Sequence, residues 1–245
     1  MKVFLNIIRF FLKLIPNNFI LIILFGPNKL FKWIKGSGIN SMWLGTYERK
    51  KVLVLSKMIK LGMVCYDIGA HVGYYSLLFS RYVGKTGMVY AFEPLPRNLK
   101  YLNNHLTLNK LLNVKIIPYA VSFKKGYSKL LFENENQSFI ARLDVNGNLK
   151  INTICIDELV KNNLILSPNI IKIDVEGHEL QVLMGAKQTL INFKPIIFVA
   201  LDNMNTKKNI FDFLTNLGYN IYNLDLNLLK IENIDNINEI IAITK

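Results

Sequence analysis

The sequence predicts an α/β fold in which a seven-stranded, doubly wound parallel sheet carries a β-hairpin insertion and an N-terminal helical extension. Three observations lead to this prediction. Short apolar runs alternate with helical patterns from residue 63 onward, as in parallel sheets with crossover helices. A glycine turn joins the first apolar run to its helix. Two β-rich segments on either side of Asn146 and Gly147 interrupt the alternation and indicate a hairpin.

Residues 1–40 form a basic, apolar extension, predicted as two helical pieces broken at Pro16 and at Gly26 and Pro27. Residues 1–60 contain eleven Lys or Arg and one acid, which gives +10 of the chain's net charge of +13. Basic residues among large aliphatic ones are typical of a helix that lies on an anionic membrane surface. Packing on the domain and a dimer contact fit the same composition, so these alternatives stay open.

A membrane span is not expected, because the uninterrupted apolar run at residues 19–25 is only seven residues long. A cleaved signal peptide is not expected either, since no small-residue cleavage site follows that run. Cys65 and Cys155 lie in apolar runs and are predicted to be buried free thiols. The expected location is cytoplasmic, with peripheral contact to the inner membrane face through residues 1–35 as an option.

Residues 41–245 are predicted to form one domain. A hairpin insertion covers residues 123–156, with strands at 127–133 and 149–156. Seven apolar runs have the length of buried strands: residues 63–66, 88–93, 114–117, 170–173, 195–201, 219–224 and 239–244. Amphipathic patterns predict helices before and between them: residues 52–59, 74–79, 98–108, 180–186 and 210–217.

The turn after the first strand predicts a nucleoside-like ligand. Asp67, Gly69 and Gly73 lie between the strand and a helix, where glycines let a ligand approach the backbone at a helix N-terminus. A dinucleotide site has three glycines and usually no acid in the turn. An aspartate repels phosphate and accepts hydrogen bonds from ammonium groups, so a cationic nucleoside such as S-adenosylmethionine is favoured. The alternative is an ordinary tight turn.

Glu93 and Pro94 end the second strand. Glu93 follows Gly73 at about the distance at which an acid accepts hydrogen bonds from ribose hydroxyls in nucleotide-binding units. This pairing favours a nucleoside ligand further. The alternative role of Glu93 is that of a helix-start residue.

Four motifs together resemble the FkbM family of S-adenosylmethionine-dependent methyltransferases. They are Gly45-x-Tyr47-Glu48, YDIGAHVGYYS at 66–76, AFEP at 91–94 and KIDVEGHE at 172–179. The likeness covers about residues 43–203, and the last motif is the most family-specific. It implies the Rossmann-like methyltransferase sheet and methyl transfer to a hydroxyl, typically of a sugar or small metabolite. A glycan, a lipid-linked sugar and a secondary metabolite are the expected acceptor classes.

The resemblance also implies which residues bind the donor. The methionine part is assigned to Asp67, Gly69 and Gly73 with Ala70 and His71 in the same turn, the ribose to Glu93 beside Pro94, and the adenine to Ala120 and Val121. His71 is expected to be a turn residue beside the donor rather than a base. The family commonly has a glutamate near the end of the fifth strand, where this chain has Ala200. If that glutamate contacts the acceptor, the acceptor of this chain differs.

Methyl transfer is an in-line displacement that also needs a base for the acceptor hydroxyl. Asp174, Glu176, His178 and Glu179 follow the fourth strand, at the edge where ligands bind in open sheets. His178 or Asp174 is the predicted base, with Glu176 beside them as a further catalytic candidate. Helix capping is the alternative for Glu176 and Glu179. His105 is expected to be an inert residue on a polar helix face.

Three alternatives remain. Asp174 with Asp202 and Asn203 resembles the divalent-metal site of catechol-type O-methyltransferases, a set that suits Mg²⁺ or Ca²⁺, although no metal is predicted. The second alternative is a nucleic-acid methyltransferase, for which the positive charge of the chain is the argument. That function is the less favoured, because the charge lies outside the core and the Asn/Asp-Pro-Pro-aromatic run of amino-methylating enzymes is absent. The third is a non-catalytic, cofactor-binding, membrane-associated protein.

Overall fold

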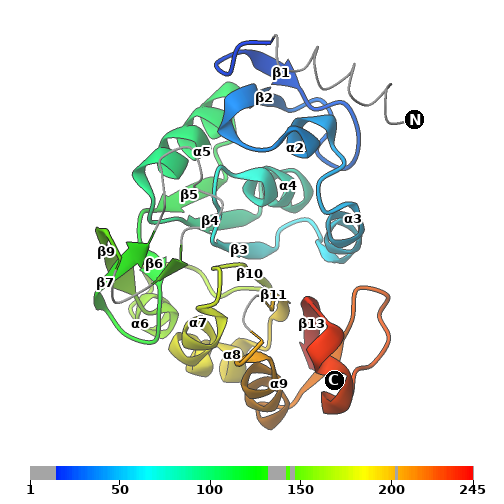
Figure 1. Ribbon diagram of the computed structural model, residues 1–245, viewed down its shortest axis with the longest axis vertical. Helices are drawn as coiled ribbons and strands as arrows, with labels where there is room; N and C mark the ends of the chain where they lie inside the picture. The colour runs from blue at the N-terminus through cyan, green and yellow to red at the C-terminus, as the bar shows by residue number, and fades with distance from the viewer. Residues whose placement is uncertain (1–14, 132–141, 144–146, 202–203, 245) are drawn as a thin grey trace.

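A computed structural model of the chain describes residues 15–131, 142–143, 147–201 and 204–244. Its centre is a seven-stranded sheet in the order β12-β13-β11-β10-β3-β4-β5 (Figure 1). All seven predicted strands are present: β3 (Val64–Ile68), β4 (Met88–Phe92), β5 (Val114–Ile117), β10 (Ile170–Ile173), β11 (Ile196–Ala200), β12 (Tyr219–Tyr222) and β13 (Glu239–Thr244).

One strand of this sheet differs from the all-parallel prediction, because β13 runs antiparallel to both β11 and β12. A parallel pair needs a crossover connection, usually an α-helix. The segment between β12 and β13 contains only a short 3-10 helix, Ile231–Asn236. The chain therefore turns back beside its neighbour, and the sheet is mixed.

Helices cover both faces of the sheet, as the doubly wound prediction requires. Successive residues of a strand point to opposite faces, so Cys65 packs with α3, α4 and α5 while Tyr66 packs with α6 to α9. The helices are α2 (Asn40–Leu44), α3 (Arg49–Met58), α4 (Tyr74–Val83), α5 (Pro96–Leu108), α6 (Ile156–Lys161), α7 (Glu179–Gly185), α8 (Lys187–Phe193) and α9 (Lys207–Asn216). Cys65 and Cys155 are free and buried, which confirms that prediction.

The predicted hairpin insertion belongs to a second, smaller sheet in the order β6-β9-β7-β8. Its strands are β6 (Ala120–Val121), β7 (Gly126–Leu131), β8 (Arg142–Leu143) and β9 (Leu149–Ile154). β7 and β9 pair antiparallel, as predicted, whereas Asn146 of the predicted turn lies outside the described residues. Leu130 and Ile151 pack with Leu95 beside the large sheet, so the small sheet is attached where β4 ends.

The extension does not contain the helix predicted before Gly26. β1 (Ile20–Ile22) and β2 (Lys32–Ile34) form an antiparallel hairpin instead, and residues 1–14 lie outside the described part. Leu21 is half-buried and Ile23 is fully buried, whereas Ile20 and Ile22 are exposed. This alternation has the period of a strand rather than of a helix. The apolar run at residues 19–25 therefore contains a short strand, Ile20–Ile22, which the helical interpretation missed.

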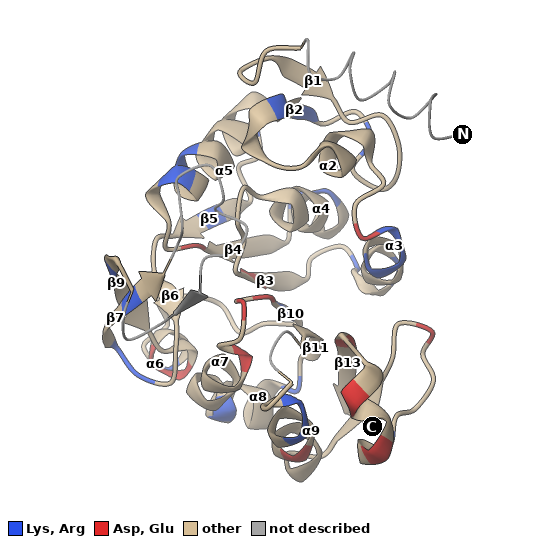
Figure 2. Cartoon of the chain, in the orientation of Figure 1, with Lys and Arg blue, Asp and Glu red and all other residues tan. Residues whose placement is uncertain are grey.

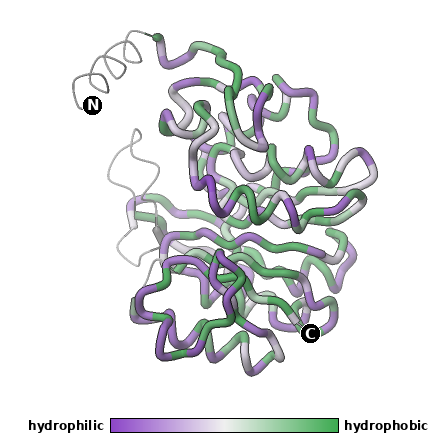
Figure 3. Tube along the Cα trace, turned by 90° about the vertical axis from the view of Figure 1, so that its right-hand side faces the viewer, coloured by the Kyte–Doolittle hydropathy of each residue, from purple (hydrophilic) through white to green (hydrophobic). Residues whose placement is uncertain are grey.

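The hairpin lies at one end of the molecule, far from the C-terminus (Figures 1 and 3). His105 of α5 attaches it to the domain: the ring stacks on fully buried Trp33 at 4.0 Å between ring centroids. Its Nε2 accepts the Ile34 N–H at 3.0 Å, and Nδ1 lies 2.8 Å from the Val72 carbonyl. The prediction that His105 sits on a polar helix face is wrong, because the hairpin covers that face.

No helix within the described ranges is long and apolar enough to cross a membrane.

Candidate active site

A cavity of about 480 Å³ opens at the carboxyl ends of β3, β4 and β10, where acidic residues follow the strands (Figure 2). This is the size of a typical small-molecule site. The loops after these strands and after β5 form much of its wall. Ten of the twelve predicted site residues line it: Gly69, Ala70, His71, Glu93, Pro94, Ala120, Val121, Asp174, Glu176 and His178.

Asp67 and Gly73 are not among the lining residues, and their assignment to the methionine part of the donor stays a prediction. The Asp67 carboxylate is fully buried; it accepts the Ser76 hydroxyl at 2.6 Å and lies 3.3 Å from Lys172 Nζ. A carboxylate without water contact needs such partners, and Lys172 stands opposite Asp67 in the register of β3 and β10. Gly73 precedes α4 with φ +95°, and a Cβ there would lie 2.6 Å from Leu102.

Gly69 is required for packing as well as for the turn. Its φ is +75°, and a Cβ would lie 1.8 Å from the Asp174 carbonyl oxygen. Its backbone N–H and that of Ala70 both donate to the Phe92 carbonyl, at 3.0 and 2.9 Å. The glycine therefore brings the loops after β3, β4 and β10 together at the cavity.

Glu93 is the acid of the second loop, and it lines the cavity. One oxygen accepts the His71 N–H at 2.8 Å; the other accepts the Leu95 N–H at 2.9 Å and the Asn98 amide at 3.2 Å. Burial raises the pKa of Glu93, and these three donors act against the shift. Because a carboxylate oxygen accepts two hydrogen bonds, the oxygen bound to His71 has capacity left for a ligand hydroxyl.

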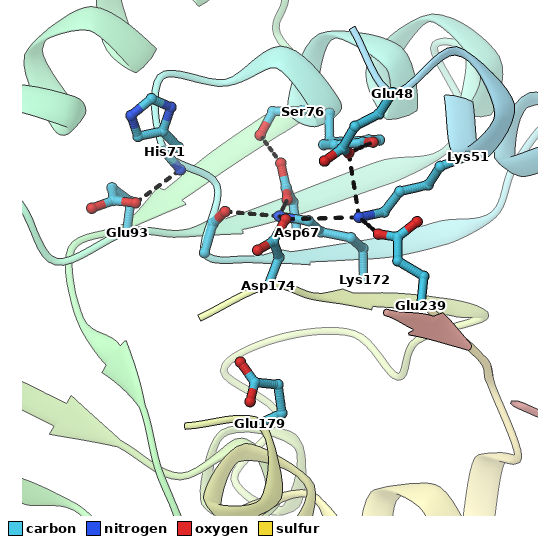
Figure 4. A network of polar contacts seen from close by, with 12 residues as sticks. Glu48, Lys51, Asp67, His71, Ser76, Glu93, Lys172, Asp174, Glu179 and Glu239 are labelled. Atoms are coloured by element: carbon cyan, nitrogen blue, oxygen red, sulfur yellow. Dashed lines mark hydrogen bonds and ion pairs between the residues drawn. The ribbon is translucent and has the colours of Figure 1, made fainter. Parts of the chain in front are cut away.

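Asp174 lies on the cavity wall between two lysines (Figure 4). Its carboxylate is 3.6 Å from Lys172 Nζ and 3.7 Å from Lys51 Nζ. Burial alone would raise the pKa of Asp174, but Lys172 and Lys51 outweigh it and hold the pKa below its ordinary value. Asp174 is therefore an ionised hydrogen-bond acceptor.

His178 contributes a neutral ring to the same wall. Burial lowers its pKa to about 4, and Nε2 lies 3.0 Å from the Ser122 hydroxyl oxygen. Glu176 lines the cavity at φ +53°. Glu179 is fully buried outside the wall and accepts the Gly177 N–H at 2.8 Å, so its contact is with the backbone before α7. His71 also lines the cavity, and burial lowers its pKa to about 3.

Several lining residues were not assigned to the site from the sequence. Tyr47, Tyr74 and Tyr75 line the cavity with aromatic rings, and the Tyr75 hydroxyl donates to Glu48. All three tyrosines belong to the motifs that carry the family resemblance, but no role in the site was assigned to them from the sequence. Lys172 belongs to the same case. Lys51 and Glu239, which complete the charge network, have no such signal.

The oxygen-rich metal alternative involves Asp202 and Asn203, which lie outside the described residues. Among the residues that the structure does describe, no group of three or more His, Cys, Asp or Glu side chains is arranged to hold a metal ion. Asp174, the remaining member of that set, is paired with lysines.

The family model of the Methyltransferase FkbM domain matches residues 67–221 of this chain. The hexuronic acid methyltransferase AglP of Haloferax volcanii is 31% identical over 137 residues, which cover 53% of each chain. The chain thus matches about half the length of this curated relative.

Solved structures agree with the fold. Methyltransferase FkbM from Methylobacillus flagellatus KT superimposes with a TM-score of 0.51 at 19% identity, over 74% of this chain and 43% of that one. Fibrillarin from Aeropyrum pernix, crystallised with natively bound S-adenosyl-L-methionine, gives 0.50 at 14% identity, over 79% and 73%. At such identities these likenesses show a shared Rossmann-like methyltransferase fold.

Proposed function

Because the chain belongs to the FkbM methyltransferase family, whose methyl donor is S-adenosylmethionine, we propose that it methylates a hydroxyl of a sugar or related small acceptor. The charge of the cavity wall carries this proposal. Glu93, Asp174 and Glu176 line it with carboxylates, and among the described lining residues Lys172 is the one ammonium group that opposes them. An acidic wall favours the positively charged sulfonium and ammonium groups of the donor.

The wall residues fit the donor in three parts. The spare acceptor capacity of Glu93 suits the ribose hydroxyls, and Ala120, Val121 and Leu130 form an apolar surface suited to a purine. Tyr47 and Tyr75 present aromatic rings, which attract cations. When bound, S-adenosylmethionine supplies an electrophilic methyl group. Asp67 acts indirectly, through Lys172 and Ser76 below the turn.

On the acceptor side, we propose that Asp174 orients the hydroxyl and that His178 takes its proton. Asp174 is ionised and can accept a hydrogen bond, and His178 is neutral at pH 7 because its pKa is about 4. Ser122 fixes the His178 ring through the contact with Nε2. Glu176 stands beside them as a further polar contact for the acceptor. The name of the relative AglP supports a hexuronic acid or another acidic sugar as the acceptor.

Calorimetry with S-adenosylmethionine and S-adenosylhomocysteine, followed by labelled methyl transfer, tests this function. Glycosides of hexuronic acids, neutral sugar glycosides and an oligonucleotide form the acceptor panel. We expect binding of both nucleosides and transfer to a sugar hydroxyl, found by mass and by the position of the new methyl ether. Transfer to the oligonucleotide alone would establish the nucleic-acid alternative. Binding without transfer to any member would favour the non-catalytic alternative.

We also propose a peripheral membrane location, which depends on the hairpin. Large apolar side chains stand exposed on and around it, between 49% and 73% of their surface: Phe19, Ile20, Ile22, Leu24, Phe25 and Leu30. Lys29 and Lys32 lie beside them and are exposed. Apolar residues flanked by basic ones favour insertion into an anionic lipid surface.

A further inference from the structure

Lys51 is a buried cation that does not line the cavity but contacts a residue that does. Its side chain is 2% exposed, and its ammonium lies 3.7 Å from Asp174 and 3.4 Å from Glu48. It also forms an ion pair with Glu239 (Figure 4). Burial would lower the pKa of Lys51, but these three carboxylates outweigh it and raise the pKa above its ordinary value. Lys51 is thus a permanent charge next to Asp174.

Glu239 reaches this cluster from the antiparallel part of the sheet. It begins β13, the antiparallel strand, and it stands opposite Ala200, the last residue of β11. Residues opposite one another in an antiparallel pair share a face, with Cβ atoms about 5 Å apart. Since Ala200 has no polar atoms beyond its backbone, β13 supplies the carboxylate on this face at the end of β11.

The resulting chain of charges alternates in sign. Asp67 pairs with Lys172, Lys172 with Asp174, Asp174 with Lys51, and Lys51 with Glu239. Asp174 is the member on the cavity wall that carries a carboxylate. The Lys51 ammonium is attracted by the carboxylates of both Asp174 and Glu239. Loss of the Glu239 charge removes one of the three carboxylates that hold the Lys51 ammonium in place.

Resting on the proposed function, we propose that Lys51 and Glu239 are positioning residues for methyl transfer: Glu239 anchors the Lys51 ammonium, and Lys51 orients the Asp174 carboxylate toward the acceptor. Neither residue lines the cavity. Their effect therefore falls on the rate of transfer rather than on the binding of the donor.

The test compares Glu239→Gln with Asp225→Asn. The first variant removes the charge and keeps the shape. The second removes the partner of exposed Lys50, the residue before Lys51 on α3, whose ammonium lies 2.6 Å from Asp225. We expect Glu239→Gln to lower kcat about tenfold, which corresponds to about 1.4 kcal/mol. The dissociation constant of S-adenosylhomocysteine measures donor binding, and the melting temperature measures the stability of the fold. We expect less than a twofold change in that constant, and Asp225→Asn to match the wild type.

A rescue variant separates positioning from a general loss of structure. Glu239→Ala removes the carboxylate, and adding Ala200→Glu returns one from the facing position of β11. We expect the double variant to recover at least a third of the kcat lost in Glu239→Ala. Unchanged kcat in Glu239→Gln, an equal loss of donor affinity, or absence of rescue in a folded double variant would overturn the inference. A wild-type protein without transferase activity would instead overturn the proposed function, and this inference with it.

Discussion

At the scale of single residues, burial decides what a carboxylate does. Asp67 lies near the end of β3 and Glu93 directly follows the neighbouring strand β4, and both belong to the motifs that carry the family resemblance. Asp67 is fully enclosed and bound to Lys172 and Ser76, whereas Glu93 faces the cavity with acceptor capacity left. The residue type and spacing predict that both acids matter, but only the packing around them separates the enclosed Asp67 from Glu93, which lines the cavity.

Glu93→Gln tests the direct contact. The amide has one acceptor oxygen, so it cannot accept both the His71 and the Leu95 N–H groups and a ribose hydroxyl as well. A hydrogen bond to a charged group contributes about 1.5–3 kcal/mol, so we expect S-adenosylhomocysteine to bind about 10- to 100-fold more weakly by calorimetry. Glu232→Gln, on an exposed position, is the control. Equal affinity in the two variants would show that Glu93 does not contact the donor.

If Glu239 positions Lys51 as proposed, we predict that its protonation makes the rate of methyl transfer depend on pH. Burial raises its pKa to about 7, Glu48 and Asp174 act in the same direction, and Lys51 opposes them. Protonation removes the charge that anchors Lys51, so we expect kcat to fall as the pH falls through about 7. The pKa of His178, about 4, is too low to produce this change. In Glu239→Gln the decline near pH 7 should be absent from the kcat profile; the same decline in both proteins would assign it to another group.

At the scale of elements, sequence and structure agree where the residues of a single segment are enough to determine the element. Strands β3, β4 and β10 are apolar runs that end in characteristic motifs, so residues within one segment suffice to predict them. The direction of β13 depends on a connection without a crossover helix. The run at residues 19–25 is apolar throughout, and neither period stands out until the domain buries Leu21 and Ile23 on one side.

His105 links the hairpin to the domain and makes its attachment sensitive to acid. Burial lowers the His105 pKa to about 4, below the value near 6.5 expected in the unfolded chain. The neutral ring accepts the Ile34 N–H, which a protonated ring cannot do. A lowered pKa means that the stabilisation is complete above pH 6.5 and is lost as the pH falls toward 4.

His105→Phe keeps a ring that stacks on Trp33 but leaves the Ile34 N–H and the Val72 carbonyl without this partner. We expect a loss of about 2 kcal/mol in the free energy of unfolding at pH 7.5, measured by denaturant titration. The variant should also lose less stability than the wild type between pH 6.5 and 4. Asn103→Ala, exposed on the same helix, is the control, and an unchanged pH slope in His105→Phe would contradict the role of the ring.

At the scale of the whole molecule, the cavity was largely predictable and the charge network behind it was not. The loops after β3, β4 and β10 converge because parallel strands end at one edge of the sheet. That rule and the motifs place ten predicted residues on one wall. Lys51 and Glu239 come from opposite ends of the chain and meet only because β13 inserts beside β11. No spacing within one segment encodes such a meeting.

The exposed apolar residues of the hairpin lead to a prediction about lipid binding. Phe19 and Phe25 are 54% and 63% exposed, and burial of such a side chain is worth about 1.5–3 kcal/mol. We expect sedimentation with vesicles containing phosphatidylglycerol, weakened by salt because the attraction to the basic segment is screened. Phe19→Ser with Phe25→Ser should lower partitioning at least tenfold, while Leu112→Ser, 96% exposed elsewhere, should not. Equal partitioning of both variants, or none by the wild type, would exclude the hairpin as the membrane contact.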